Sequence, residues 1–119
     1  MSEQLSPCPR FQFSCVCSRD DAMCLQRVEP LTVSGDPVLA FARLKDLVSR
    51  TARTVVLTAT DTYLHAECRT RLGFIDDLEC RLCPTGRVIH VRSASRFGIW
   101  DWGVNRRRVQ RLRRQLRRE

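Results

Sequence analysis

Residues 92–106 bring together the side chains that are best suited to binding an anion. Two serines lie between two arginines in this stretch, and an asparagine and a further arginine follow at the expected start of a helix. Guanidinium and hydroxyl groups donate to phosphate and carboxylate oxygens, and the free N–H groups of a helix start add further donors. We therefore expect an anion-binding corner for phosphate or carboxylate. Its residues are Arg92, Ser93, Ser95, Arg96, Asn105 and Arg106.

A structural explanation of this stretch stands beside the functional one. Asp101 and Asn105 are suited to cap the helix that follows. The arginines of the corner are also able to pair with acidic side chains of a neighbouring strand. In that case the corner stabilises the fold and binds no ligand.

Asp76 and Asp77 adjoin each other inside a segment whose residues alternate like those of a strand. Strict alternation buries Asp76, and a buried carboxylate needs a charged partner or a raised pKa. Arg71, Arg92 or Arg96 supplies that charge, unless a β-bulge turns both acids outward. We favour a structural ion network of Arg71, Asp76 and Asp77, because such networks also place acids in unusual positions. An enzyme that uses Asp76, Asp77 or His90 is kept as an alternative function.

Seven cysteines raise the question of metal binding. Cys15, Cys17, Cys80 and Cys83 are candidates for a structural zinc site, with Cys24 near the first two. A Cys-x-x-Cys pair at a turn is a usual half of such a site, but Cys-x-Cys is not its usual other half. The odd number of cysteines and the lack of a signal peptide predict mostly reduced thiols and no disulfide framework. We expect no metal and no cofactor.

The positive charge of the chain is concentrated in its last segment. Eight arginines and one glutamate give residues 104–119 a charge of +7, which leaves +1 of the total of +8 for the rest of the chain. A basic helix of this kind binds nucleic acid, an acidic protein surface or anionic lipid headgroups through electrostatics. Membrane insertion by the helix lacks support, because its apolar stripe contains no bulky aromatic residue. Electrostatic nucleic-acid binding through this helix is therefore the first alternative function, although no stacking motif for single strands accompanies it.

Two helices are expected to hold these groups against a sheet. The first begins at Asp36 and Pro37, because the aspartate caps free N–H groups and proline lacks an N–H at the first helical position. Its apolar residues recur at three- and four-residue spacing, opposite a polar face. The second helix is rich in arginine and has a narrow apolar stripe of Val109, Leu112 and Leu116.

Five segments alternate in the manner of strands. The first, residues 27–33, contains Pro30, which restricts it to an edge or a bend of the sheet. The other four are joined by short turns, as is typical of an antiparallel meander. They are residues 54–59, 63–70, 73–82 and 87–94. The expected fold class is α+β, in the order strand, helix, four-stranded antiparallel meander, helix, which matches TATA-binding-protein-like and helix-grip folds by analogy only.

The alternation assigns side chains to two faces of the expected sheet. The polar face includes His65, Glu67, Asp77 and His90, which permits a metal site or a proton relay. We favour a solvated ladder of opposite charges, because surface ion pairs are the commoner use of such residues. The apolar face, which the helices cover, consists of Val55, Leu57, Ala59, Leu64, Ala66, Cys68, Phe74, Leu78, Cys80, Leu82, Ile89 and Val91.

The chain has the size and composition of one globular domain. Its 119 residues are 43% hydrophobic and 29% charged, which is unlike a disordered chain. Residues 1–24 are expected to form an irregular arm that contains cysteines and prolines, and residues 25–119 a single α+β domain. The sequence shows no signal peptide and no stretch of about 18 apolar residues. We therefore expect a soluble, cytoplasmic protein without a transmembrane segment.

Several blocks of the sequence resemble one known family. They are Arg27-Val-Glu-Pro-Leu31, Tyr63-Leu-His-Ala-Glu67, residues 71–77 and Ile89-His-Val-Arg-Ser-Ala-Ser-Arg96. From about Cys8 to Leu116 the chain is similar to the bacterial and plastid family called domain of unknown function number 1499. That resemblance implies no established activity that can be carried over to a residue. We expect a small binding or accessory module rather than an enzyme, with a small anionic ligand or an acidic protein surface as its partner.

Overall fold

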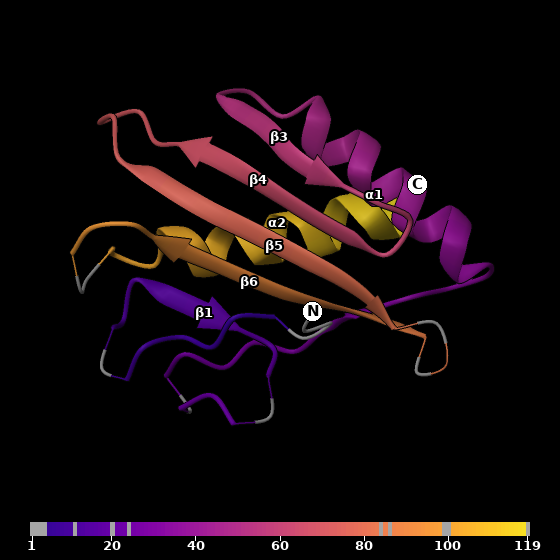
Figure 1. The fold of residues 1–119 in the computed structure, drawn as a ribbon, viewed down its shortest axis with the longest axis horizontal. Coiled ribbons are helices and arrows are strands. Elements are labelled where there is room, and N and C mark those ends of the chain that lie inside the picture. Colours follow the sequence, from indigo (N-terminus) through magenta and orange to yellow (C-terminus); the bar gives the residue numbers. More distant parts are fainter. Residues whose placement is uncertain are drawn as a thin grey trace.

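Eight elements make up the described part of the chain in this computed structural model, which covers residues 5–10, 12–19, 21–23, 25–83, 85, 87–98 and 101–118. Figure 1 shows one sheet with both helices on the same face. The predicted α+β class is confirmed. The elements are β1 (Cys15–Cys17), β2 (Leu31–Thr32), α1 (Pro37–Ser49), β3 (Thr54–Ala59), β4 (Tyr63–Arg69), β5 (Ile75–Cys83), β6 (Val88–Ser95) and α2 (Val104–Arg118).

The sheet has six strands in the order β1-β6-β5-β4-β3, with β2 also paired to β6. Strands β3 to β6 form the expected antiparallel meander, in which each strand lies beside its neighbour in the sequence. The sheet is wider than the four strands predicted, because β1 and β2 both pair with β6. β2 is shorter than the expected strand at residues 27–33, since Pro30 has no N–H to donate to a ladder. The analogy with TATA-binding-protein-like and helix-grip folds stays a prediction.

The helix α1 begins where the sequence predicts. The side chain of Asp36 accepts a hydrogen bond from the backbone N–H of Val38 at 2.9 Å, and Pro37 occupies the first turn. Asp36 thereby satisfies one of the N–H groups that a helix start leaves free. The apolar stripe of the helix is buried against the sheet and consists of Ala40, Phe41, Leu44 and Val48.

The faces of β3 differ from the prediction. Val56 packs against the core, so Val55 points to the other side of the sheet and is 61% exposed. A register shift directly after Val56 leaves Leu57 exposed as well. The prediction that Val55 and Leu57 face the helices is therefore wrong, because alternation does not reveal a bulge in an edge strand. Phe74 is also exposed, since it lies in the turn before β5.

The first residues of the chain are more ordered than the predicted irregular arm. β1 pairs with β6, and Cys15 in β1 forms a disulfide with Cys8. The Cα atoms of this pair are 5.7 Å apart, a distance that suits a disulfide. The prediction of reduced thiols is therefore wrong for these two residues, and Cys24 lies outside the described residues. The free cysteines of the described part are Cys17, Cys68, Cys80 and Cys83.

Replacing Phe41 by alanine tests the placement of α1. The ring is fully buried, and loss of a buried phenylalanine costs about 3–5 kcal/mol of unfolding free energy. Urea unfolding followed by circular dichroism measures this loss. Leu39→Ala is the control, because Leu39 lies in the same helix but is 59% exposed, and it should cost less than about 1 kcal/mol. Equal costs for the two changes would contradict the packing described here.

Candidate anion-binding site

The start of α2 is fixed by the carboxylate of Asp101. It accepts hydrogen bonds from the backbone N–H groups of Gly103 at 2.8 Å and Asn105 at 2.9 Å. These N–H groups have no partner within the helix itself. Trp102 and Gly103 have positive φ angles of 57° and 79°, so the chain makes a left-handed turn directly before the helix. This turn places Asn105 against the sheet.

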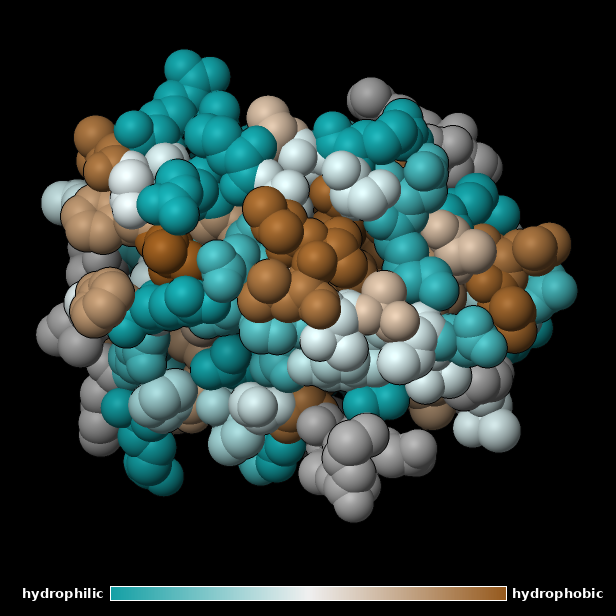
Figure 2. All heavy atoms as spheres, turned by 45° about the horizontal axis from the view of Figure 1, so that its top comes forward, coloured by the Kyte–Doolittle hydropathy of each residue, from teal (hydrophilic) through white to brown (hydrophobic). Residues whose placement is uncertain are grey.

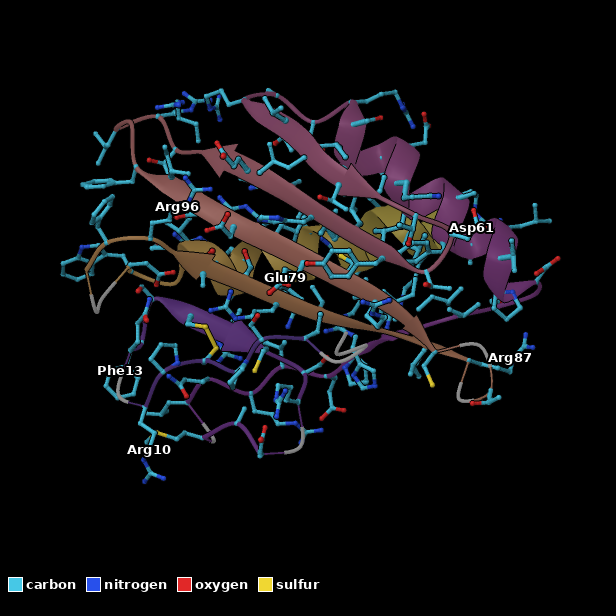
Figure 3. All side chains as sticks on the ribbon, in the orientation of Figure 1. Arg10, Phe13, Asp61, Glu79, Arg87 and Arg96 are labelled. Atoms are coloured by element: carbon cyan, nitrogen blue, oxygen red, sulfur yellow. A yellow bond between two sulfur atoms is a disulfide. The ribbon has the colours of Figure 1, made fainter. Side chains whose placement is uncertain are left out.

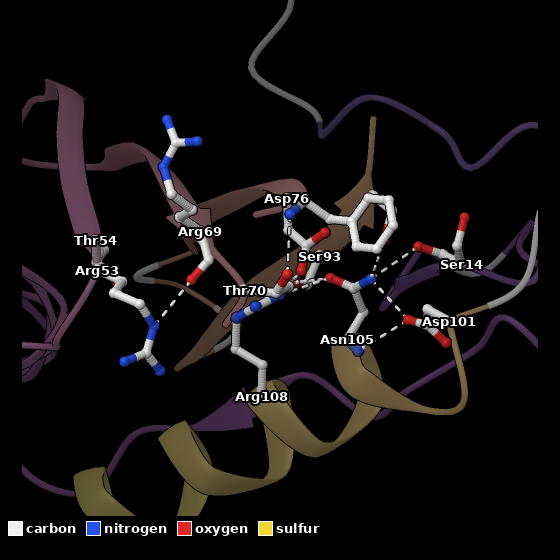
Figure 4. Close-up of polar contacts among 12 residues, drawn as sticks. Ser14, Arg53, Thr54, Arg69, Thr70, Asp76, Ser93, Asp101, Asn105 and Arg108 are labelled. Carbon is white, nitrogen blue, oxygen red and sulfur yellow. Dashed lines mark hydrogen bonds and ion pairs between the residues drawn. The ribbon is translucent and has the colours of Figure 1, made fainter. Parts of the chain in front are cut away.

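Asn105 joins α2 to β6 and to the first residues of the chain. Its Oδ1 atom accepts hydrogen bonds from the hydroxyl of Ser93 and from Arg108, both at 2.7 Å. Its Nδ2 group donates to the backbone oxygen of Ser14 at 2.9 Å and to the hydroxyl of Ser95 at 3.1 Å. Figure 4 shows these contacts meeting at one side-chain amide. Because Asn105 is fully buried, the network fixes the orientation of the first turn of α2.

Asp76 lies beside this network on the face of β5 that the helices cover. It is fully buried, as strict alternation predicts, and its Oδ2 atom lies 2.8 Å from Nη1 of Arg108. The two groups are poorly aligned for a hydrogen bond, so the contact is an ion pair. A buried charge left without its partner remains in a medium of low dielectric, so such a pair is costly to break.

The partner of Asp76 comes from a helix and not from a neighbouring turn. Arg71 is exposed and forms no ion pair with Asp76 or Asp77 in the described part of the chain. Asp77 points to the opposite face of β5 and pairs with Arg96. The sequence held one signal for Arg108, since it falls at helical spacing inside the buried stripe of α2. The pattern alone did not single out Arg108, because residues 104–119 contain eight arginines.

The structure brings together three of the six residues predicted for the anion corner. Ser93, Ser95 and Asn105 meet on the inner side of the sheet. Arg92 and Arg96 project from the outer face, because neighbouring residues of a strand point to opposite sides. The arginines and serines of β6 therefore cannot hold one anion together.

Two arginines of α2 hold the segment that leads into β2. Arg106, the sixth predicted corner residue, donates to two backbone oxygens of this segment at 2.7 and 3.1 Å. Arg113 donates to two more at 2.8 and 3.0 Å. Burial lowers the pKa of Arg113 from its ordinary value. These two side chains therefore serve the fold, while Arg107, Arg111 and Arg114 are exposed on α2.

The outer face of the sheet carries a ladder of charge pairs. Arg96 donates to Asp77 at 2.9 Å and to Glu67 at 3.0 Å. His65 Nε2 lies 2.9 Å from Asp77 Oδ1. Figure 3 looks onto this face, where Arg96 and Glu79 are labelled. The hydrogen bonds from Arg96 hold the pKa of Asp77 below its usual value, and the same contact raises the pKa of Arg96.

The candidate catalytic and metal-binding groups are separated in space. Asp76 and Asp77 point to opposite faces of β5, and His90 contacts a serine of the arm through Nδ1 at 3.0 Å. Cys17 and Cys80 also lie on opposite faces, as their registers with β6 show. Among the residues that the structure describes, no group of three or more His, Cys, Asp or Glu side chains is placed to hold a metal ion.

A cavity of about 320 Å³ opens beside the Asp76–Arg108 pair. It is lined by the turn after α1, the end of β4 and the first turns of α2. Arg53 has a left-handed backbone with a φ angle of 56°, and its Nε group donates to the backbone oxygen of Arg69 at 3.2 Å (Figure 4). Six arginines line the cavity: Arg53, Arg69, Arg71, Arg107, Arg108 and Arg111.

The positive charge around this cavity is largely uncompensated. Arg108 pairs with Asp76, whereas the other five arginines form no ion pair with any described residue. Like charges that share one cavity repel each other, and a cavity wall of low dielectric strengthens the field inside it. An anion in the cavity relieves that repulsion. This site was not predictable from the sequence, because its arginines come from three separate segments and no single stretch contains them.

Cys68 also lines the cavity and lies opposite Asp76 in the register of β4 and β5. It is only 5% exposed, and burial raises the pKa of its thiol. The thiol is therefore protonated at neutral pH and is a poor nucleophile. The cavity is therefore suited to binding an anion, and its only thiol among the described residues is not suited to attack a ligand.

These observations define a small α+β domain with an arginine-lined cavity between its sheet and its last helix. The chain belongs to the family described as protein of unknown function (DUF1499), whose family model matches residues 4–116. The resemblance found in the sequence is thereby confirmed. No curated protein and no solved structure matches the chain. None of the helices within the described residues is long and apolar enough to cross a membrane.

Replacing Arg108 by methionine should destabilise the fold by about 3–5 kcal/mol, because Asp76 is left charged and buried without a partner. The double variant Arg108→Met/Asp76→Leu should recover most of this loss, since no lone charge remains. Chemical unfolding of both variants measures the coupling. Arg114→Met is the control, because Arg114 is exposed on the same helix. A single-variant cost no larger than that of the control would refute the anchoring role of the pair.

The lowered pKa of Asp77 predicts a loss of stability in acid. The ionised carboxylate stabilises the fold above its ordinary pKa of 3.8, and this contribution disappears as the pH falls through the lower pKa of the folded state. Asp77→Asn should flatten the fall in stability between about pH 5 and pH 2, as measured by thermal unfolding. Asp46→Asn, from an exposed pair with Arg50, should keep the original slope. Identical slopes for Asp77→Asn and the original protein would disprove the assignment.

Proposed function

We propose that the protein is a binding module whose ligand carries a phosphate group, and that this group enters the arginine-lined cavity. The observation that carries the proposal is the set of five guanidinium groups that share the cavity without an acidic partner among the described residues. Guanidinium groups bind phosphate and carboxylate oxygens in pairs and stay charged at all physiological pH values. We thus retain the predicted anion binding, but in the neighbouring cavity and not in the anion-binding corner of residues 92–106.

The surroundings of the cavity support a preorganised site. Arg108 is held by Asp76 and Asn105 before any ligand arrives. The side chain of Arg53 is held by a hydrogen bond from its Nε group to the backbone oxygen of Arg69. A site whose donors are already in place loses less conformational entropy when it binds. These contacts support tight recognition of a small anionic group.

A binding role accounts for this site better than catalysis does. Asp77 and His90 lie on the far face of the sheet, and the charge of Asp76 is already used by Arg108. The cavity thus has cationic donors but no general base within the described residues that line it. We therefore place the enzyme that uses Asp76, Asp77 or His90 behind the binding module.

Electrostatic nucleic-acid binding is the second candidate, and one observation favours it. Arg107, Arg111 and Arg114 are exposed and follow one another at helical spacing along α2. A row of cations along a helix is able to track a phosphate backbone. Such binding weakens steeply and log-linearly with salt, whereas a phosphate held inside a cavity loses affinity less steeply.

The cytoplasmic location expected from the sequence stays a prediction. The Cys8–Cys15 disulfide weighs against it, because disulfides persist chiefly in oxidising compartments. The proposed function does not depend on the compartment, since neither Cys8 nor Cys15 lines the cavity.

Titration calorimetry with inorganic pyrophosphate tests the proposed function. The original protein should bind, and Arg53→Gln/Arg111→Gln should bind at least about tenfold more weakly, because hydrogen bonds to charged groups contribute about 1.5–3 kcal/mol each. Arg87→Gln is the matched control, since Arg87 is exposed in the β5–β6 hairpin at the other end of the sheet (Figure 3). Absence of pyrophosphate binding, or equal weakening in the control, would overturn the proposal.

A further inference from the structure

We propose that the cavity end of the domain docks on a membrane surface, where the arginines bind the phosphate of an anionic phospholipid and nearby apolar side chains enter the interfacial layer. This inference rests on the proposed function and names the source of the phosphate. It concerns attachment to a surface, not a span across it.

Large apolar side chains are exposed in two turns at this end of the molecule. Leu72 is 85% exposed and Phe74 55% exposed in the turn between β4 and β5. Phe97 is 75% exposed and Trp102 80% exposed in the connection from β6 to α2. Exposed apolar groups that gather in one region mark an interaction surface more often than isolated ones do.

The two turns lie side by side. The backbone N–H of Arg96 donates to the backbone oxygen of Ile75 at 3.0 Å, one step beyond the last pair of the β5–β6 ladder. Phe74 directly precedes Ile75 and Phe97 directly follows Arg96, so both phenylalanines lie just beyond this contact. In Figure 1 the turn between β4 and β5 and the start of α2 lie at the left end of the sheet, and Figure 2 shows brown apolar groups among teal ones at that end.

These apolar residues adjoin the arginines of the cavity. Leu72 directly follows Arg71, which lines the cavity. Arg107, another lining residue, donates to the backbone oxygen of Trp102 at 2.7 Å. Cationic donors and apolar side chains therefore share one end of the domain, and the five arginines that form no ion pair with a described residue give that end a positive charge.

This combination matches the chemistry of a bilayer surface. Aromatic rings favour the boundary between lipid headgroups and acyl chains, and the phosphates lie at the same depth. Cationic residues close to an anionic leaflet add about 1 kcal/mol each. Surface attachment usually requires two such contributions together, apolar insertion and charge attraction.

A nucleic-acid strand fits this surface less well. Bases stack on flat aromatic or guanidinium groups. The three exposed aromatic rings offer such faces, but Leu72, the most exposed of the four apolar residues, does not. Its burial in a lipid interface is favourable, whereas beside a single strand it stays in water. We therefore commit to a lipid surface as the partner.

Vesicle sedimentation tests the inference with the full chain. The protein should sediment with phosphatidylcholine vesicles that also contain phosphatidylserine and should remain in solution with phosphatidylcholine alone. Arg53→Gln/Arg111→Gln should weaken the partition about 30-fold, since each arginine contributes about fivefold. Leu72→Ser/Phe97→Ser should weaken it at least about tenfold through the lost apolar insertion.

Leu39→Ser is the matched control for the apolar change. Leu39 is also exposed, but it lies in the first turn of α1 and does not line the cavity, so its replacement should leave vesicle binding as it was. All three changes affect exposed side chains, and thermal unfolding confirms that each variant is folded. Equal weakening by Leu39→Ser would overturn the inferred docking surface.

Pyrophosphate titration separates this inference from the proposed function. Leu72→Ser/Phe97→Ser should bind pyrophosphate like the original protein, because neither residue lines the cavity. Pyrophosphate binding without vesicle binding would refute the membrane inference and leave the proposed function intact. If the original protein binds neither pyrophosphate nor vesicles, both the proposed function and the membrane inference are refuted. Tighter binding to single-stranded RNA than to the vesicles, weakened by the same apolar change, would replace the lipid surface with nucleic acid.

Discussion

The ion pair between Asp76 and Arg108 is the contact on which the rest of this end of the molecule depends. It joins the middle of the sheet to α2 inside the core, with a distance of 2.8 Å between charged atoms. A helix turns by about 100° per residue, so one inward-facing arginine sets the direction of all the others. With Arg108 fixed, Arg107 and Arg111 fall at the cavity, and Arg106 and Arg113 reach the chain before β2.

The arginine-rich helix is therefore divided among several tasks, although its sequence is nearly uniform. Arg108 neutralises a buried carboxylate, and two others satisfy backbone oxygens of the segment before β2. Arg107 and Arg111, which also line the cavity, make no ion pair with a described residue. A net charge summed over the segment conceals this division. Charge becomes available for binding only where the fold supplies no acid of its own, as at the end of β4 and in the turns around it.

Much of the architecture was predictable because it depends on local patterns. The cap at Asp36, the alternation of β4 to β6 and the burial of Asp76 all follow from residues that are near each other in the sequence. The partner of Asp76 was not predictable, because a pairing over 32 positions needs the packing of α2. The bulge after Val56 leaves no mark in the sequence either, since β-branched residues occupy both faces of β3.

The candidate site also depends on contacts between segments that are distant in the sequence, which local patterns do not predict. Arg92 and Arg96 were assigned to one corner with Ser93 and Ser95, although strand geometry separates neighbours onto two faces. That error was avoidable from period-two alternation alone. The cavity was not predictable from alternation, because Arg53, Arg69 and Arg107 belong to segments that come together only in the folded sheet.

The bulge in β3 has a consequence for how this protein meets copies of itself. β3 is the last strand of the sheet, and its outward side chains Val55 and Leu57 are apolar and exposed. A regular edge of that kind invites a strand from another molecule to extend the sheet, which is how many proteins begin to aggregate. The register shift after Val56 interrupts the even spacing of donors and acceptors along that edge. The irregular edge of β3 therefore disfavours the addition of a strand from another molecule.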